Sequence, residues 1–244
     1  MNGFTGVRAA IVATGTFVLT AVLLTGCTAA PVAPSPSTVA SEAPSPIATA
    51  AVEPIDTVVA LVARPEALEM RDASGAVVTE LDYLGDVDAA IATIERVLGE
   101  APVDEEFPGG SHNSPSTAHR WGAFELWERR YVDNWSEFAS RERTLYRPSF
   151  SVVFTGPEVA GVALTTEDGI VAGTSWTDLQ AMPGLQLNPS GCSGPYLDYT
   201  AYDESWPDGT VHEQRYGVDF IANDDASAIL RVRAPLAIHE EGCA

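Results

Sequence analysis

Lysine is absent from the sequence, so all 13 basic residues are arginine, against 34 acidic residues and a formal net charge of −21. A chain of this charge is repelled by nucleic acid and by anionic lipid headgroups, and we therefore expect no nucleic-acid partner. The acidity is typical of a solvated surface, and it also suits a basic partner or divalent cations. We interpret the missing lysine as codon bias rather than as a functional signal.

Histidine is scarce too, and we expect no metal and no cofactor. His112 and His119 are seven residues apart, which is not a helical ligand spacing, and no CxxC pair accompanies the cysteines. The acidic residues at 82, 86 and 88 lack the glycine and closing glutamate of a calcium loop, and helix capping explains the last two better. Glycine-rich phosphate loops and dinucleotide fingerprints are missing as well.

No nucleophile–base pair is identifiable, so we predict no catalytic residues. Ser190-Gly191-Cys192-Ser193-Gly194 fails the GxSxG pattern of a nucleophile elbow, because Gly194 follows Ser193 directly. We interpret this stretch as a turn that carries a disulfide. Cys192 and Cys243 are an even pair of cysteines, and in an oxidising compartment we expect them to form a disulfide with each other. The alternative is a pair of free thiols.

The first 27 residues have the three parts of an export signal. A short basic segment ends at Arg8, an uncharged apolar run follows to about Leu24, and Leu24-Thr25-Gly26-Cys27 resembles the lipobox of bacterial lipoproteins. The resemblance implies that the Cys27 thiol receives a diacylglycerol and that residues 1–26 are removed. Two acyl chains are about what stable anchoring needs. We expect a cell-membrane lipoprotein that is lipid-anchored on the extracellular face.

Two alternatives to the lipobox stay open. The apolar run of about 16 residues is short for a transmembrane helix, which needs about 20. Ordinary secretion with cleavage near Ala29-Ala30 is the other. In either case residues 27–56, rich in Pro, Ala and Ser, are typical of an extended tether, which is a plain spacer or a glycosylated stalk. Residues 57–244 are then left for a globular domain.

Hydrophobic periodicity predicts the elements of that domain. Val87, Ile91, Ile94 and Leu98 lie on one face of a helix, which Asp86 or Asp88 caps and Gly99 ends. A second, shorter helix is predicted at 176–182, and a short one at 131–140. We predict strands at 57–63, 67–71, 76–83, 117–129, 150–155, 159–165, 196–202, 216–222 and 228–233. The loop from Gly99 to about Pro115 is rich in Gly, Pro and Ser.

This order predicts an α+β fold, with antiparallel sheets and one or two helices packed on one face. Helix, aromatic strand and hairpin occur twice, which allows repeat units at 57–168 and 169–244. With Asp168-Gly169-Ile170-x-x-Gly173, the layout resembles a tandem pair of β-lactamase-inhibitor-protein-like units. The chain as a whole also resembles lipoproteins of high-GC Gram-positive bacteria, a resemblance that implies no activity.

Aromatic residues are the one feature that indicates binding. Tryptophan and tyrosine are enriched at interface anchors, although they are also ordinary core residues. We expect Trp121, Trp127 and Trp176 in the core. Candidate ligand-binding residues are Trp206, Tyr196 and Tyr199. We therefore expect a non-enzymatic binding domain for an envelope protein or a cell-wall ligand, and the alternative is a cell-envelope hydrolase.

Overall fold

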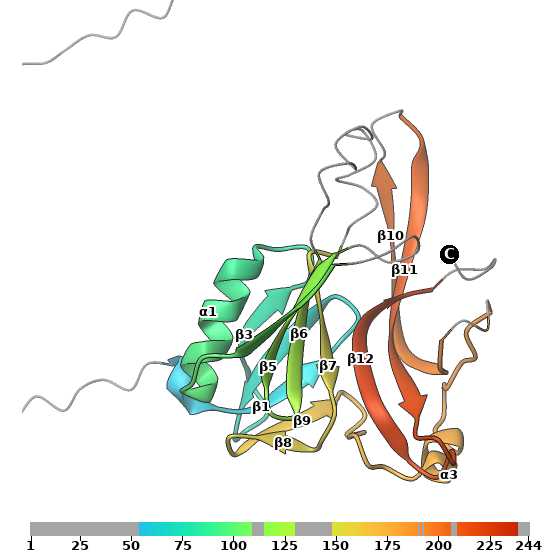
Figure 1. Cartoon of the computed structure of the whole chain (residues 1–244). Helices are drawn as coiled ribbons and strands as arrows, with labels where there is room; N and C mark the ends of the chain where they lie inside the picture. Colours follow the sequence, from blue (N-terminus) through green and yellow to red (C-terminus); the bar gives the residue numbers. More distant parts are fainter. Residues whose placement is uncertain are drawn as a thin grey trace, which may run out of the picture. The chain divides into compact units, whose positions relative to one another are not determined.

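The computed structural model describes residues 54–108, 115–129, 148–189, 191, 193–205 and 209–238. All of them belong to one compact unit that begins at Thr49. The described residues form two β-sheets and two α-helices, which confirms an α+β fold with sheets (Figure 1). The 3-10 helix η1 (Pro54–Thr57) opens the described chain, so the last residues of the predicted tether already lie in regular structure.

The first sheet has five strands, and β1 lies at its centre. Its strands, in spatial order, are β3 (Val77–Asp82), β2 (Ala67–Asp72), β1 (Val58–Ala63), β9 (Val162–Thr166) and β8 (Glu158–Val159). β2 and β3 form the predicted hairpin, which turns through Gly75. β1 and β9 pair in parallel, so this sheet is mixed, whereas the prediction was of antiparallel sheets.

The second sheet has seven strands, all paired antiparallel. In spatial order they are β10 (Tyr196–Ser205), β11 (Val211–Ala222), β12 (Ile229–Ala237), β7 (Phe150–Phe154), β6 (Phe124–Arg129), β5 (Ser116–Trp121) and β4 (Val103–Phe107). The hairpin of β10 and β11 extends beyond the other strands of its sheet (Figure 1).

The strand predictions are wrong in detail at four places. One is 159–165, where β8 and β9 form a tight hairpin that turns at Ala160 and Gly161 instead of a single strand. Residues 117–129 form two strands rather than one, because the chain reverses at Gly122, whose φ is +58°. The loop after Gly99 contains β4, an exposed and acidic edge strand that carries no hydrophobic alternation. β7 and β9 belong to different sheets, so the hairpin of the first predicted repeat unit does not form.

Helix α1 (Val87–Leu98) begins and ends as predicted. The Asp86 carboxylate accepts the N–H of Ala89 at 2.8 Å, and Gly99 adopts the left-handed conformation, φ +73°, that ends many helices. The buried face of α1 consists of Ala90, Ile94 and Leu98. The second helix, α3 (Trp176–Gln180), is capped by Ser175 and is shorter than predicted.

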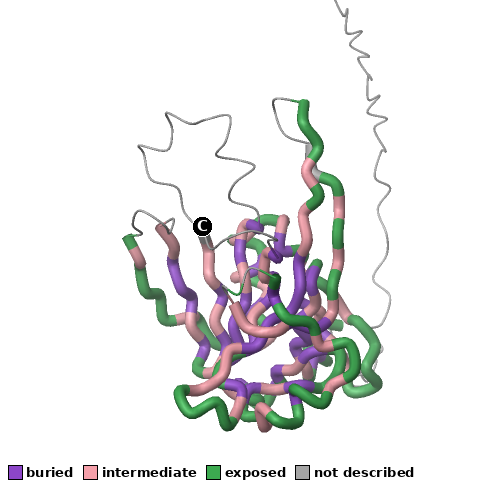
Figure 2. Tube along the Cα trace, turned by 90° about the vertical axis from the view of Figure 1, so that its right-hand side faces the viewer, coloured by how far each residue is buried: buried purple, intermediate pink, exposed green. Residues whose placement is uncertain are grey.

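One hydrophobic cluster connects both sheets with both helices. Its largest fully buried side chains include Leu68 and Met70 of the five-stranded sheet and Phe124 and Phe154 of the seven-stranded sheet. The buried segments gather in the interior, and exposed segments lie at the outer turns (Figure 2). Among the described residues, no helix is long and apolar enough to cross a bilayer.

Candidate functional site: a pocket between the two sheets

Both sheets contribute to a pocket of about 290 Å³. The five-stranded sheet supplies β2, β3 and the turns that flank them, and the seven-stranded sheet supplies β10, β11 and β12. The lining residues are Pro65, Glu66, Ala67, Glu80, Asp82, Tyr83, Leu84, Pro148, Thr200, Tyr202, Tyr216 and Pro235. Small-molecule sites occupy clefts of about 300 Å³ upward, so this pocket has room for one small ligand or one side chain.

Tyr83 follows β3 directly and is held by both sheets. Its N–H donates to the carbonyl of Glu66 at 3.3 Å, and its own carbonyl accepts the N–H of Ser149 at 2.8 Å. Its ring contacts Phe150 edge to face, with centroids 5.4 Å apart. Only 1% of Tyr83 is exposed, so its position in the pocket lining is fixed by packing.

Two phenolic hydroxyls in this lining, those of Tyr83 and Tyr202, are buried and have no hydrogen-bond partner among the residues that the structure describes. The main-chain N–H of Arg64 lies near the Tyr83 hydroxyl, but it donates to the carbonyl of Ala67 at 3.1 Å and leaves Tyr83 unpaired. Burial raises the pKa of Tyr83 well above 10.0, so the group stays protonated. A buried polar group without a partner costs about 1–3 kcal/mol, which makes these hydroxyls exceptional.

The Tyr202 ring stacks on the ring of Tyr216, with centroids 5.8 Å apart. The two tyrosines lie diagonally on the antiparallel strands β10 and β11, because Tyr202 is opposite Gln214 and Tyr216 is opposite Thr200. Their stack places aromatic surface beside the unpaired hydroxyl of Tyr202. The inner lining is therefore aromatic and apolar, with a few polar atoms.

Three exposed carboxylates, those of Glu66, Glu80 and Asp82, surround this inner lining. Asp82 also accepts the N–H of Leu84 at 2.8 Å, which fixes the turn after β3. No arginine or histidine is among the described residues that line the pocket. The pocket therefore carries negative charge that no basic group in its lining offsets.

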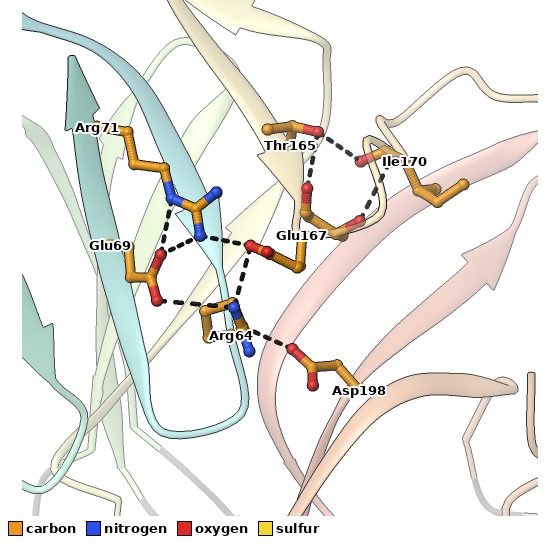
Figure 3. Close-up of polar contacts among 8 residues, drawn as sticks. Arg64, Glu69, Arg71, Thr165, Glu167, Ile170 and Asp198 are labelled. Carbon is orange, nitrogen blue, oxygen red and sulfur yellow. Dashed lines mark hydrogen bonds and ion pairs between the residues drawn. The ribbon is translucent and has the colours of Figure 1, made fainter. Parts of the chain in front are cut away.

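A network of charged side chains lies beside the pocket and joins the two sheets (Figure 3). Arg64 is the residue before Pro65 of the lining, and its guanidinium contacts Asp198 of β10 at 2.7 Å and Glu167, after β9, at 3.0 Å. Arg71 of β2 pairs with both Glu69 and Glu167. Because Arg64 holds the turn between β1 and β2 against β10, the network fixes one wall of the pocket.

Local structure places the acidic members of the network. The turn that carries Glu167 is closed by Thr166, whose hydroxyl accepts the N–H of Ile170 at 3.1 Å (Figure 3 shows this turn). Asp198 has a φ of +48°, and the register of β10 and β11 shifts beside it. A single extra residue in a strand redirects the side chain there, which here brings the Asp198 carboxylate to Arg64.

We predict that Glu167→Gln lowers stability at neutral pH but not in acid. The hydrogen bond from Arg71, helped by the charge of Arg64, lowers the pKa of Glu167 below its ordinary value of 4.5. The stabilisation is therefore present above that value and is lost as pH falls through the lowered pKa. The side chain is 43% exposed, so the loss at pH 7 is at most about 1 kcal/mol.

Urea unfolding at a series of pH values measures this difference. Glu158→Gln on β8 removes a similarly exposed carboxylate outside the network and is the matched control. A constant gap between Glu167→Gln and the wild type from neutral to strongly acidic pH would show that the charge of Glu167 is not what stabilises the network.

We predict that Tyr83→Phe stabilises the domain. The change removes a buried oxygen that has no partner among the described residues, so we expect the free energy of unfolding to rise by about 1 kcal/mol and Tm by about 2–4 °C. Tyr196→Phe is the control, because the Tyr196 hydroxyl donates to Gln186 Oε1 at 2.8 Å. Its loss should lower the free energy by about 0.5–1.5 kcal/mol. Destabilisation by Tyr83→Phe would mean that its hydroxyl has a structural partner.

The candidate binding residues from the sequence lie elsewhere or outside the described residues. Tyr196 is 5% exposed at the start of β10 and its hydroxyl is paired, whereas Tyr199 is 46% exposed. Neither is among the residues that line the pocket. Trp206, Cys27, Cys192 and Cys243 lie outside the described residues.

A second hollow, of about 410 Å³, lies among η1, β3 and α1. It is the larger of the two, but Ile55, Val78 and Ala92 make much of it apolar, and its Arg96 pairs with Asp56 at 3.4 Å. None of the buried side-chain atoms that lack a partner belongs to its described lining. The pocket between the sheets is therefore the better candidate site.

His119 is one of the two histidines whose spacing the sequence analysis considered. Its Nδ1 lies 2.8 Å from Asp104 and its Nε2 lies 3.3 Å from Glu128, on the two strands that flank β5. Both ring nitrogens are thus taken up by carboxylates. Within the described part of the chain, no group of three or more His, Cys, Asp or Glu residues is arranged to hold a metal ion.

Comparison of the chain with protein-family models, curated proteins and solved structures returned no match.

Proposed function

We propose that the protein is a lipid-anchored extracytoplasmic lipoprotein whose globular domain binds a ligand without transforming it. The observation that carries the proposal is the pocket between the sheets, where two buried phenolic hydroxyls have no partner within the described part of the chain. In folded proteins nearly all buried polar groups have a hydrogen-bond partner. A pair of exceptions in one lining supports a site whose hydrogen bonds are completed by a ligand.

The composition of the lining supports binding over catalysis. The described residues that form it include neither serine, cysteine nor histidine, the usual nucleophiles and bases of hydrolases. Carboxylates alone serve glycoside hydrolysis, so an envelope hydrolase remains the competing function and is an outcome of the test below.

The lipobox and the tether support the location. Leu24-Thr25-Gly26-Cys27 is followed by about 30 residues of Pro-rich chain, which places the domain away from the membrane. An extracellular location also suits a Cys192–Cys243 disulfide, which we retain as a proposal. Maleimide labelling of the unfolded, unreduced mature chain should modify no thiol, and labelling after reduction should modify both cysteines.

The finer fold is a proposal as well: α1 and α3 cover one face of the sheets. Ala90 and Ile94 of α1 and Leu179 of α3 belong to the same buried cluster as the strands, which supports it.

Ligand recovery separates binding from turnover. The mature chain is incubated with the small-molecule fraction of an envelope extract, washed, and heated to release what it holds, and mass spectrometry identifies the released compounds. A binding protein returns a compound unchanged, and Glu80→Gln recovers less of it. Steady conversion of that compound into a product would instead establish the hydrolase.

A further inference from the structure

We propose that the pocket binds a primary ammonium group on an aliphatic chain, an inference that rests on the pocket being the binding site. The first support is charge. Glu66, Glu80 and Asp82 surround the pocket, and its described lining contains no cationic side chain. A cleft lined by one sign of charge concentrates ions of the opposite sign.

The neighbouring arginines do not neutralise this charge. Arg64 and Arg71 are paired with Glu69, Glu167 and Asp198, so the network holds two cations and three carboxylates. The net charge of −21 adds to the same potential. An anionic ligand is therefore disfavoured at this site, whereas a cation is attracted to it.

The second support is the aromatic surface. Tyr83, Tyr202 and Tyr216 contribute three rings to one small pocket. The faces of aromatic rings attract cations, and the attraction grows as water is excluded. Neutral sugars also stack on tyrosine, but they draw no benefit from the negative charge of three carboxylates in this lining.

The third support is that the lining offers hydrogen-bond acceptors, which a ligand with N–H donors can satisfy. Carboxylates only accept hydrogen bonds, and a phenolic oxygen accepts as well as donates. An ammonium group brings three N–H donors, whereas a quaternary cation brings none. The hydroxyls of Tyr83 and Tyr202 are buried in this conformation, so contact with the ligand requires the lining around them to rearrange.

Size favours an aliphatic chain behind the ammonium. The volume is about 290 Å³, and Pro65, Leu84, Pro148 and Pro235 supply apolar surface for methylene groups. The group that fits is carried by free alkyl amines and by lysine side chains. Both sources present the same chemistry, and two probes distinguish them below.

Calorimetric titration of the mature chain with n-butylammonium chloride at low ionic strength tests the proposal. We expect saturable binding that weakens with added salt. The double variant Glu66→Gln/Glu80→Gln should bind at least tenfold more weakly. The control Glu100→Gln/Glu158→Gln removes the same charge from exposed positions outside the pocket and should bind as the wild type does.

The neutral analogue 1-butanol, which has the same number of heavy atoms, decides between charge and shape. If it binds as well as n-butylammonium, the ammonium proposal is overturned and the binding function stands. If n-butylammonium does not bind while the envelope extract still yields a ligand, the outcome is the same. If the extract yields none either, both proposals fail. Tighter binding of Nα-acetyl-lysine amide than of 1,5-diaminopentane assigns the source to a lysine side chain, and the reverse assigns it to a free amine.

Discussion

Arg233→Met is expected to lower the free energy of unfolding by about 3 kcal/mol, because it leaves a buried carboxylate without its partner. Asp219 on β11 has a fully buried side chain, and Arg233 on β12 donates to both of its oxygens, one bond being 2.9 Å long. The N–H of Gly194 also faces this carboxylate. A Cβ at Gly194 would lie 1.7 Å from the Phe220 carbonyl oxygen, so only glycine permits this approach.

Two variants make this prediction specific. Arg96→Met breaks a pair with Asp56 in which both side chains are 52% exposed, and it should change stability by less than about 0.5 kcal/mol. Asp219→Leu/Arg233→Met removes both charges and should recover much of the loss. Denaturant unfolding measures all three. A loss of under about 1 kcal/mol in Arg233→Met would mean that Asp219 is not held as a buried ion.

The loss should also depend on pH. Burial raises the pKa of Asp219 above 3.8, while Arg233 opposes the rise. A carboxyl whose pKa is raised on folding binds protons more readily in the folded state, so its ionisation lowers stability as pH rises from 3.8 through the raised pKa. Without Arg233 the pKa rises further. The deficit of Arg233→Met should therefore shrink in acid, where Asp219 becomes neutral.

Cys27→Ala is expected to abolish membrane attachment. The lipobox resemblance assigns both acyl chains to this one sulfur, and no second anchor is proposed. Each buried methylene contributes about 0.8 kcal/mol, so losing two chains removes the whole membrane affinity. Cell fractionation with immunoblotting, together with labelled fatty acid incorporation, measures the change. Cys192→Ala leaves the lipobox intact and should stay in the membrane fraction. Equal pelleting and equal labelling of Cys27→Ala would disprove the anchor.

Local signals in the sequence predict the parts of the fold that depend on local chemistry. Val87–Leu98 has both its capping residues in sequence, and the hairpin of β2 and β3 turns at a glycine, so both were predicted correctly. The parallel pairing of β1 with β9 joins residues about a hundred positions apart. No local pattern encodes such a pairing. β4 was missed because an edge strand needs no buried face, and its residues are mostly acidic and exposed.

The pocket could not be predicted from the sequence either, because it also depends on contacts between distant parts of the chain. Tyr83 reads as an ordinary strand residue, and Tyr202 and Tyr216 read as part of a general aromatic excess. Only the packing of the two sheets brings them together with Glu66 and Glu80. The alternation of side chains along β10 also breaks at the register shift near Asp198. The face of the sheet on which the later tyrosines of β10 lie therefore cannot be derived from the strand pattern.

The thermal shift of the mature chain in the small-molecule fraction of an envelope extract tests the central claim most directly. A ligand that binds the folded state raises Tm. The account predicts that Tm of the wild type rises in the extract, while Tyr83→Phe starts from a higher Tm and rises less, because it has lost a hydroxyl that the ligand would pair. An equal rise in both proteins, or none in the wild type, would contradict the assignment of this pocket as the binding site.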